Sequence, residues 1–69
     1  MKHYTVLYEW GERSWSAYVP DLPSCIATGK TRERVEQRIR EAIVFHIEGL
    51  IERGEPVPEP SLEAGVIDV

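Results

Sequence analysis

The apolar residues of this sequence change their spacing once, between Gly29 and Thr31. Before that point they alternate with polar residues, which is the spacing of half-buried β-strands. After it they recur about every 3.6 residues, as they do along an amphipathic helix. The sequence therefore predicts an α+β domain, in which a small sheet is followed by one long helix packed on one of its faces.

Three strands are predicted before the change, over residues 4–10, 14–19 and 25–28. Gly11 opens the first turn. Pro20 and Pro23 interrupt the chain after the second strand, because proline lacks the amide donor that a sheet requires. The connections are short, so an antiparallel meander is the simplest topology for these strands.

The helix is predicted over residues 32–53. Thr31 supplies its N-terminal cap, and Gly54 ends it with Pro56 just beyond. One broad stripe of its residues should cover the sheet. The stripe consists of Val35, Ile39, Ala42, Ile43, His46, Ile47 and Leu50.

Residues 54–61 carry a proline at every second position from 56 to 60, which predicts an extended segment without internal hydrogen bonds. We interpret it as a stiff connector that carries the chain back along the sheet. The alternative is a recognition motif for a proline-binding domain. Residues 65–69 then predict a last short strand, which completes a β-β-β-α-β order.

A chain of 69 residues builds only one small core and needs additional stabilisation. The single Cys25 rules out an internal disulfide, and one cysteine with two distant histidines forms no metal framework, so we expect no metal and no cofactor. Self-association remains, as a homodimer or tetramer. Val44, Phe45 and Ile51 lie outside the helical stripe and are the expected contacts, although isolated surface apolar residues are also common.

The net charge of −4 is unevenly distributed along the chain. Residues 1–40 carry seven basic and five acidic side chains, whereas residues 41–69 carry one basic and seven acidic. An acidic C-terminal half suits a basic partner. The four arginines of residues 32–40 alternate with glutamates, which is typical of an ion-paired solvent face, so direct nucleic-acid binding is not expected.

No apolar run approaches the roughly 20 residues of a membrane span, and no apolar stretch that would mark a signal peptide follows Lys2. We therefore expect a cytoplasmic protein without membrane contact.

Two residue sets invite a catalytic interpretation. Glu9, Asp21 and Asp68 could hold a divalent metal if strand ends bring them together. Cys25 and His46 could pair as nucleophile and base. No motif fixes either spacing, so solvated carboxylates, a buried thiol and a core-facing histidine are the favoured interpretations. We expect no catalytic residue and no enzyme activity.

The residues from position 14 onward resemble the HicB antitoxin family. Residues 14–25 read Ser-Trp-Ser-Ala-Tyr-Val-Pro-Asp-Leu-Pro-Ser-Cys, and residues 54–61 read Gly-Glu-Pro-Val-Pro-Glu-Pro-Ser. Between them Ala27-Thr28-Gly29 and the segment 39–43 are also similar. The resemblance implies a partial ribonuclease H-like fold without a working metal site. It also implies an antitoxin of a type II system, whose toxin, HicA, is a small basic ribonuclease that cuts messenger RNA.

Two departures from the family stand out. Ser24 occupies a turn position where the family usually has glycine. Typical members also append a DNA-binding module, and none follows Val69, so we expect a single HicB-like domain over residues 1–69 without DNA binding.

The leading hypothesis is an antitoxin that masks a basic HicA-like ribonuclease. Its expected toxin contacts are the turn residues Asp21 and Leu22, taken as exposed, and a helical face of Glu41, Phe45, Glu48 and Glu52, although Phe45 equally suits the homodimer. The alternatives are an orphan oligomeric scaffold or small-ligand-binding domain and, third, a minimal metal-dependent nuclease.

Overall fold

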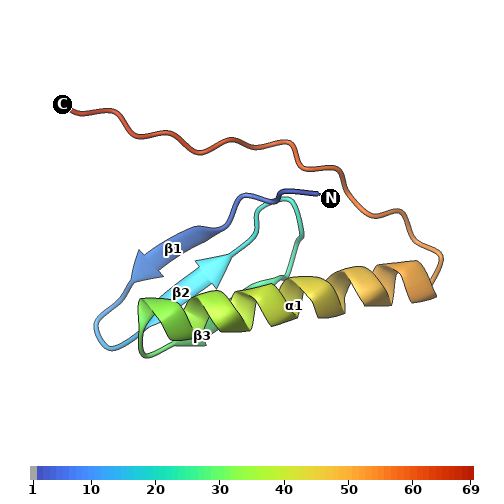
Figure 1. Ribbon diagram of the computed structural model, residues 1–69, viewed down its shortest axis with the longest axis horizontal. Helices are drawn as coiled ribbons and strands as arrows, with labels where there is room; N and C mark the ends of the chain where they lie inside the picture. The colour runs from blue at the N-terminus through green and yellow to red at the C-terminus, as the bar shows by residue number, and fades with distance from the viewer. Residues whose placement is uncertain (1) are drawn as a thin grey trace.

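A computed structural model describes residues 2–69 of the chain. Its elements are β1 (Leu7–Trp10), β2 (Trp15–Tyr18), β3 (Ile26–Gly29) and α1 (Arg32–Glu52). The strands form one antiparallel sheet in the order β1-β2-β3, and α1 lies across one of its faces (Figure 1). The predicted α+β class and the meander are confirmed, although each strand is shorter than predicted.

The first hairpin is closed by a hydrogen bond from the Gly11 N–H to the Ser14 carbonyl, 2.8 Å. In its register Trp10 lies opposite Trp15, and the two rings pack with centroids 5.5 Å apart at an angle of 53°. Such tilted aromatic pairs stabilise a strand pair beyond the apolar area that they bury. The aromatic residues that marked the strands in the sequence thus also fix their register.

The core lies between the sheet and the first half of α1. Its buried members are Ala17, Val19, Leu22, Cys25, Val35 and Ile39. Leu22 has no exposed surface, because the loop after β2 folds back on itself through bonds from the Leu22 N–H to the Val19 carbonyl and from the Cys25 N–H to the Leu22 carbonyl, both 3.0 Å. The expectation that Leu22 is exposed was therefore wrong. The two flanking prolines close the loop inward, so its one large apolar side chain enters the core.

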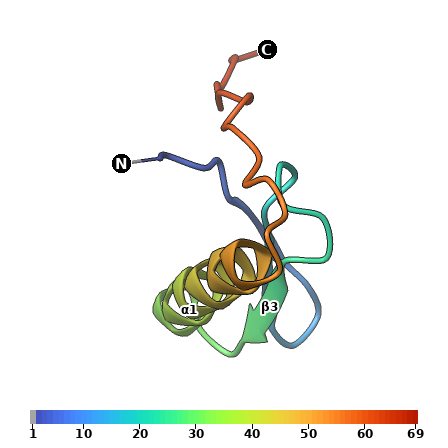
Figure 2. The same cartoon turned by 90° about the vertical axis from the view of Figure 1, so that its right-hand side faces the viewer.

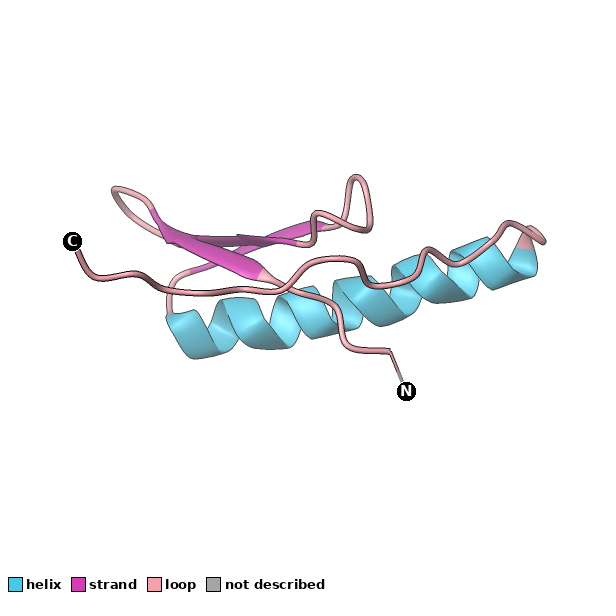
Figure 3. Ribbon diagram, turned by 90° about the horizontal axis from the view of Figure 1, so that it is seen from above, coloured by secondary structure: helices cyan, strands magenta, loops and turns pink. Residues whose placement is uncertain are grey.

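Helix α1 begins as predicted, with the Arg34 N–H donating to Thr31 Oγ1 at 3.0 Å. Val35 and Ile39 are buried, and the other residues of the predicted stripe are partly buried, so the stripe is confirmed. Figure 3 shows the helix running under the sheet and then extending past it. The end of α1 is therefore not covered by the sheet.

The predicted last strand does not form. Residues 55–69, which we call the C-terminal tail, are extended and without regular secondary structure. The tail is held near the N-terminal segment by bonds from the Tyr4 hydroxyl to the Pro58 carbonyl, 2.5 Å, and from Thr5 Oγ1 to the Leu62 carbonyl, 2.7 Å. The proline segment is thus extended, as predicted, whereas its interpretation as a connector stays a prediction. Residues 65–69 have a strand-like sequence but find no ladder partner in the described chain, and a strand requires one.

Ser24 has a φ of +73°, in the left-handed region that glycine adopts without strain. Gly54 has nearly the same backbone, with a φ of +70° and no atom within 4 Å of the position of an added Cβ. The usual glycine of the family at position 24 is explained by this turn. The two sites form a matched pair: both have a left-handed backbone, but Ser24 carries a side chain there and Gly54 carries none.

Replacing Ser24 by Gly should raise the free energy of unfolding by about 0.5–1 kcal/mol, since the left-handed backbone penalises a Cβ more than glycine costs in chain entropy. Gly54→Ser should lower it by a similar amount. Urea unfolding of both variants measures these changes. Equal signs at the two sites would contradict the backbone explanation.

Candidate partner-binding surface

One side of α1 carries acidic residues around an exposed aromatic ring. Glu41, Phe45, Glu48 and Glu52 are spaced by four, three and four positions, which places them along one helical face. All four are exposed, and Phe45 leaves 79% of its surface in solvent. We call this set the acidic helix face. The structure does bring these four predicted residues together.

The carboxylates of the acidic helix face form no ion pair within the described residues. Over residues 2–69 the ion pairs are Lys2–Glu59, Arg32–Glu36, Arg40–Glu36 and Arg53–Glu55, and none includes a carboxylate of this face. The last turn of α1 also lacks a basic residue, so Glu48 and Glu52 add to the partial negative charge at the helix C-terminus. The resulting potential favours a positively charged partner.

Val44 and Ile51 border this face and are 52% and 64% exposed. Their predicted exposure, like that of Phe45, is confirmed. Their contact with a second chain stays a prediction.

Asp21 makes contacts within the chain, and its predicted contact with a toxin stays a prediction. Its carboxylate accepts hydrogen bonds from the Ser61 N–H, 2.9 Å, and from Ser61 Oγ, 2.6 Å. These bonds, the hydroxyl first, hold the pKa of Asp21 below its usual value of 3.8 because they stabilise the ionised form. Asp21 is thus the anchor that ties the C-terminal tail to the loop after β2.

The Asp21 anchor should open in acid. Its pKa is lower when folded than when unfolded, so its contribution to stability is complete above pH 3.8 and is lost as the pH falls through the lower, folded value. In an NMR titration from about pH 6 to about pH 2, the Ser61 amide should shift with the protonation of Asp21. Asp21→Asn, which keeps the shape and removes the titration, is the control; an unchanged Ser61 profile in that variant would contradict the assignment.

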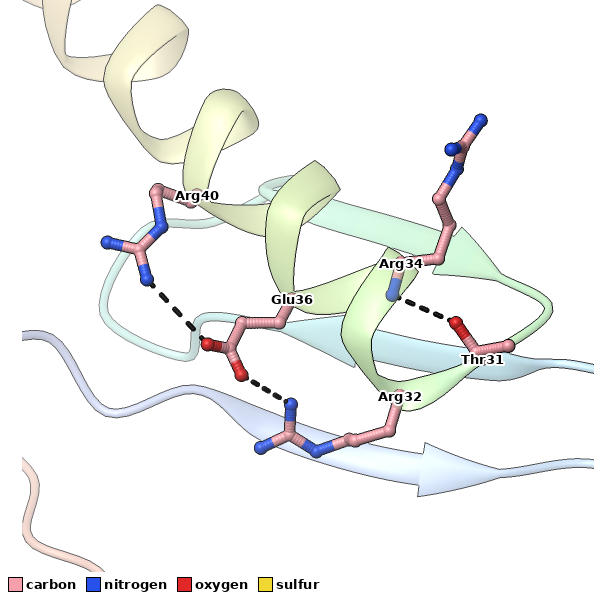
Figure 4. Close-up of polar contacts among 5 residues, drawn as sticks. All are labelled: Thr31, Arg32, Arg34, Glu36 and Arg40. Carbon is pink, nitrogen blue, oxygen red and sulfur yellow. Dashed lines mark hydrogen bonds and ion pairs between the residues drawn. The ribbon is translucent and has the colours of Figure 1, made fainter.

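The arginines of the first helical turns divide into two groups. Arg32 and Arg40 pair with the two oxygens of Glu36, at 2.9 Å and 3.7 Å, as Figure 4 shows. Arg34 points away from this group, and Arg38 donates to the Thr28 carbonyl at 3.0 Å. Both line a hollow of about 620 Å³ together with Lys30. The predicted ion-paired face therefore exists for the first group, whereas the second group forms a basic corner without an acidic partner in residues 2–69.

The three candidate metal-binding carboxylates are not brought together within the described chain. Within the described chain no three His, Cys, Asp or Glu side chains approach closely enough to hold a metal ion, so Glu9, Asp21 and Asp68 do not form a cluster. Cys25 is buried, and burial raises the pKa of its thiol. His46 is partly buried on α1. A thiol with a raised pKa carries little of the thiolate that acts as a nucleophile.

The open face of the sheet carries a row of apolar side chains that the sequence analysis missed. Leu7 lies opposite Tyr18, and Tyr18 lies opposite Ile26. They are 38%, 41% and 62% exposed, on the side of the sheet away from α1. Only the strand register shows that the three side chains adjoin. The signal available in the sequence was that all three residues are large and largely apolar.

Comparison with known proteins identifies the family of this chain. Residues 4–68 match the family described as "HicB_like antitoxin of bacterial toxin-antitoxin system". The chain belongs to this HicB-like antitoxin family, which confirms the resemblance found in its sequence.

The relatives differ in how much of their length the chain covers. It is 41% identical to a UPF0150 protein of Synechocystis sp., over 87% of this chain and 77% of that protein. It is 36% identical to an uncharacterized protein of Haemophilus phage HP1 and 31% identical to Antitoxin HicB 2 of Photorhabdus laumondii, over 81% and 84% of this chain. The chain spans 42% of the length of each of these two relatives. No solved structure matches it.

Among residues 2–69 there is no helix with both the length and the apolar character needed to cross a bilayer.

Proposed function

We propose that this chain is an antitoxin module that binds a small, basic ribonuclease of the HicA type and covers its active surface. The observation that carries this proposal is the acidic helix face, whose three carboxylates lack basic partners in residues 2–69; Glu48 and Glu52 also lie toward the negative end of α1. Carboxylates in that position destabilise the isolated helix. A basic partner removes this cost when it binds, so the arrangement suits a binding surface.

The proposed interaction is steric and electrostatic and involves no chemical step by this chain. Phe45 supplies the apolar centre of the contact, since aromatic side chains at the middle of an interface contribute most of the binding energy. Glu41, Glu48 and Glu52 surround it and attract a basic protein over a distance, which speeds encounter. Family membership supports a non-enzymatic role of this kind.

Reversing two charges of the face tests the electrostatic part. The double variant Glu48→Lys/Glu52→Lys should weaken binding of the toxin encoded beside this gene by about tenfold or more, mainly through a slower association rate. Stopped-flow association at two salt concentrations measures this rate. The double variant Glu9→Lys/Glu12→Lys, on β1 and in the β1–β2 turn, is the matched control, because it makes the same charge change on two exposed residues away from the face.

Phe45→Ala should instead act on the dissociation rate, because it removes a desolvated contact and no charge. Inhibition of RNA cleavage by the toxin gives an independent readout of masking. If the unaltered chain fails to inhibit that nuclease at every stoichiometry, the proposed function is wrong.

An oligomeric scaffold of the same fold is a second candidate. The observation in its favour is the set of exposed apolar residues on α1, Val44 and Ile51, at the end of the helix that the sheet does not cover. A chain that self-associates but does not inhibit the neighbouring toxin would fit this function and contradict the first. The nuclease alternative is not proposed, since its three carboxylates do not come together.

A further inference from the structure

The sheet has an unpaired edge at β1. In the order β1-β2-β3, β1 bonds to β2 on one side only, so the N–H and C=O groups of its outer side have no ladder partner within the described sheet. Beside this edge lies a hollow of about 370 Å³ between β1 and α1, which we call the β1 groove. Its apolar lining consists of Tyr4, Val6, Tyr8, Ile39, Ile43 and Val44. Free edges of this kind accept an additional strand.

The end of the C-terminal tail has the complementary property. Residues 65–69 include three β-branched side chains, Val66, Ile67 and Val69, and all three are exposed. Ile67 and Val69 share one side of the extended segment, whereas Val66 and Asp68 share the other. The chain thus contains one strand without a sheet and one sheet edge without a strand.

We propose that residues 65–69 of one copy add as a fourth strand along the free edge of β1 in a second copy, and that the exchange is reciprocal. The side chains of Ile67 and Val69 then enter the β1 groove, because that side of the segment is entirely apolar. Reciprocal exchange gives a two-fold dimer, in which each copy both donates and accepts a strand.

The length and charge of residues 65–69 suit them to the edge of β1 and its groove. Four-residue β1 and the five-residue segment match in length, at about 3.3 Å per residue. The charged residues that line the groove are Lys2, Glu36 and Arg40. Lys2 already pairs with Glu59 of the tail, whereas the side chain of Arg40 is 74% exposed and makes only a 3.7 Å contact with Glu36. Arg40 is therefore the basic group of the groove that can attract Asp68.

The anchors of the tail explain why a second copy is the recipient. Bonds to Tyr4, Thr5 and Asp21 fix residues 58–62 on the same chain. Pro56, Pro58 and Pro60 keep this segment extended where it passes Lys2 and Tyr4 at the rim of the chain's own groove. Figure 1 and Figure 2 show the segment beyond these anchors leaving the body of the fold. The end of the tail is therefore presented outward.

This inference does not rest on the proposed function, because it concerns another surface. The acidic helix face contributes no residue to the β1 groove, and Val44 is the one residue of the predicted self-association set that lines it. A monomeric chain that still inhibits the toxin would overturn this inference alone.

Sedimentation equilibrium of the 69-residue chain tests the dimer. We expect a mass of twice 7.9 kDa, or a multiple of that dimer. Ile67→Asp should raise the dissociation constant at least about 100-fold, because both copies lose an apolar anchor. Val66→Asp is the matched control on the other side of the segment and should change it by less than about tenfold. A monomer, or equal effects of the two variants, would overturn the proposal.

An isotope-filtered NOE experiment separates exchange between copies from closure within one chain. In a mixture of labelled and unlabelled protein, the Ile67 and Val69 methyl groups should show intermolecular contacts to Val6 and Tyr8. The result that overturns the proposal is contact within one chain only, or no contact to these residues. Val44→Glu, which places a charge in the groove at a half-exposed position, should remove the intermolecular signals while the sheet signals persist.

Discussion

The fold depends on the packing of two helical residues, Val35 and Ile39, against the inner face of a three-strand sheet. Both are almost completely buried, and each contributes about 1.5–3 kcal/mol by leaving water. Ala17 at the centre of the sheet and Leu22 from the following loop complete this contact. Few other side chains are fully buried. The contact therefore determines where the sheet lies on the helix, and everything beyond it is held by weaker interactions.

Placing this contact in the first half of α1 has a consequence for the second half. The sheet covers only the beginning of a 21-residue helix, so later residues extend past it (Figure 3). Those residues include Glu48 and Glu52 of the acidic helix face. The first half of α1 packs against the sheet, and the second half carries the proposed binding residues. Charge reversal at Glu48 or Glu52 therefore leaves the core unchanged. Effects of these variants on binding can thus be distinguished from effects on stability.

Most of the fold follows from local sequence. The single change of period located the sheet and the helix, and Thr31 with Gly54 fixed the helix ends, because capping and periodicity act over a few residues. The predictions that Leu22 is exposed and that residues 65–69 form a strand were wrong for a different reason. The burial of Leu22 depends on how a loop closes in three dimensions, and the last strand depends on a partner edge elsewhere. Likewise, helical spacing assembles Glu41, Phe45, Glu48 and Glu52, whereas the bond between Asp21 and Ser61 joins positions forty residues apart.

The C-terminal tail is strand-like in sequence but has no ladder partner within the described chain. Natural sequences are locally consistent with their folds, so a strand-like segment that remains exposed indicates an interaction outside the single chain. The Asp21 anchor strengthens this argument, because it fixes the start of the tail and so limits where the tail can reach. Releasing the anchor lets the tail bend toward its own groove and changes the balance between closure and exchange. Asp21→Ala, which removes the acceptor and leaves the groove intact, should therefore weaken self-association without removing the apolar residues that mediate it.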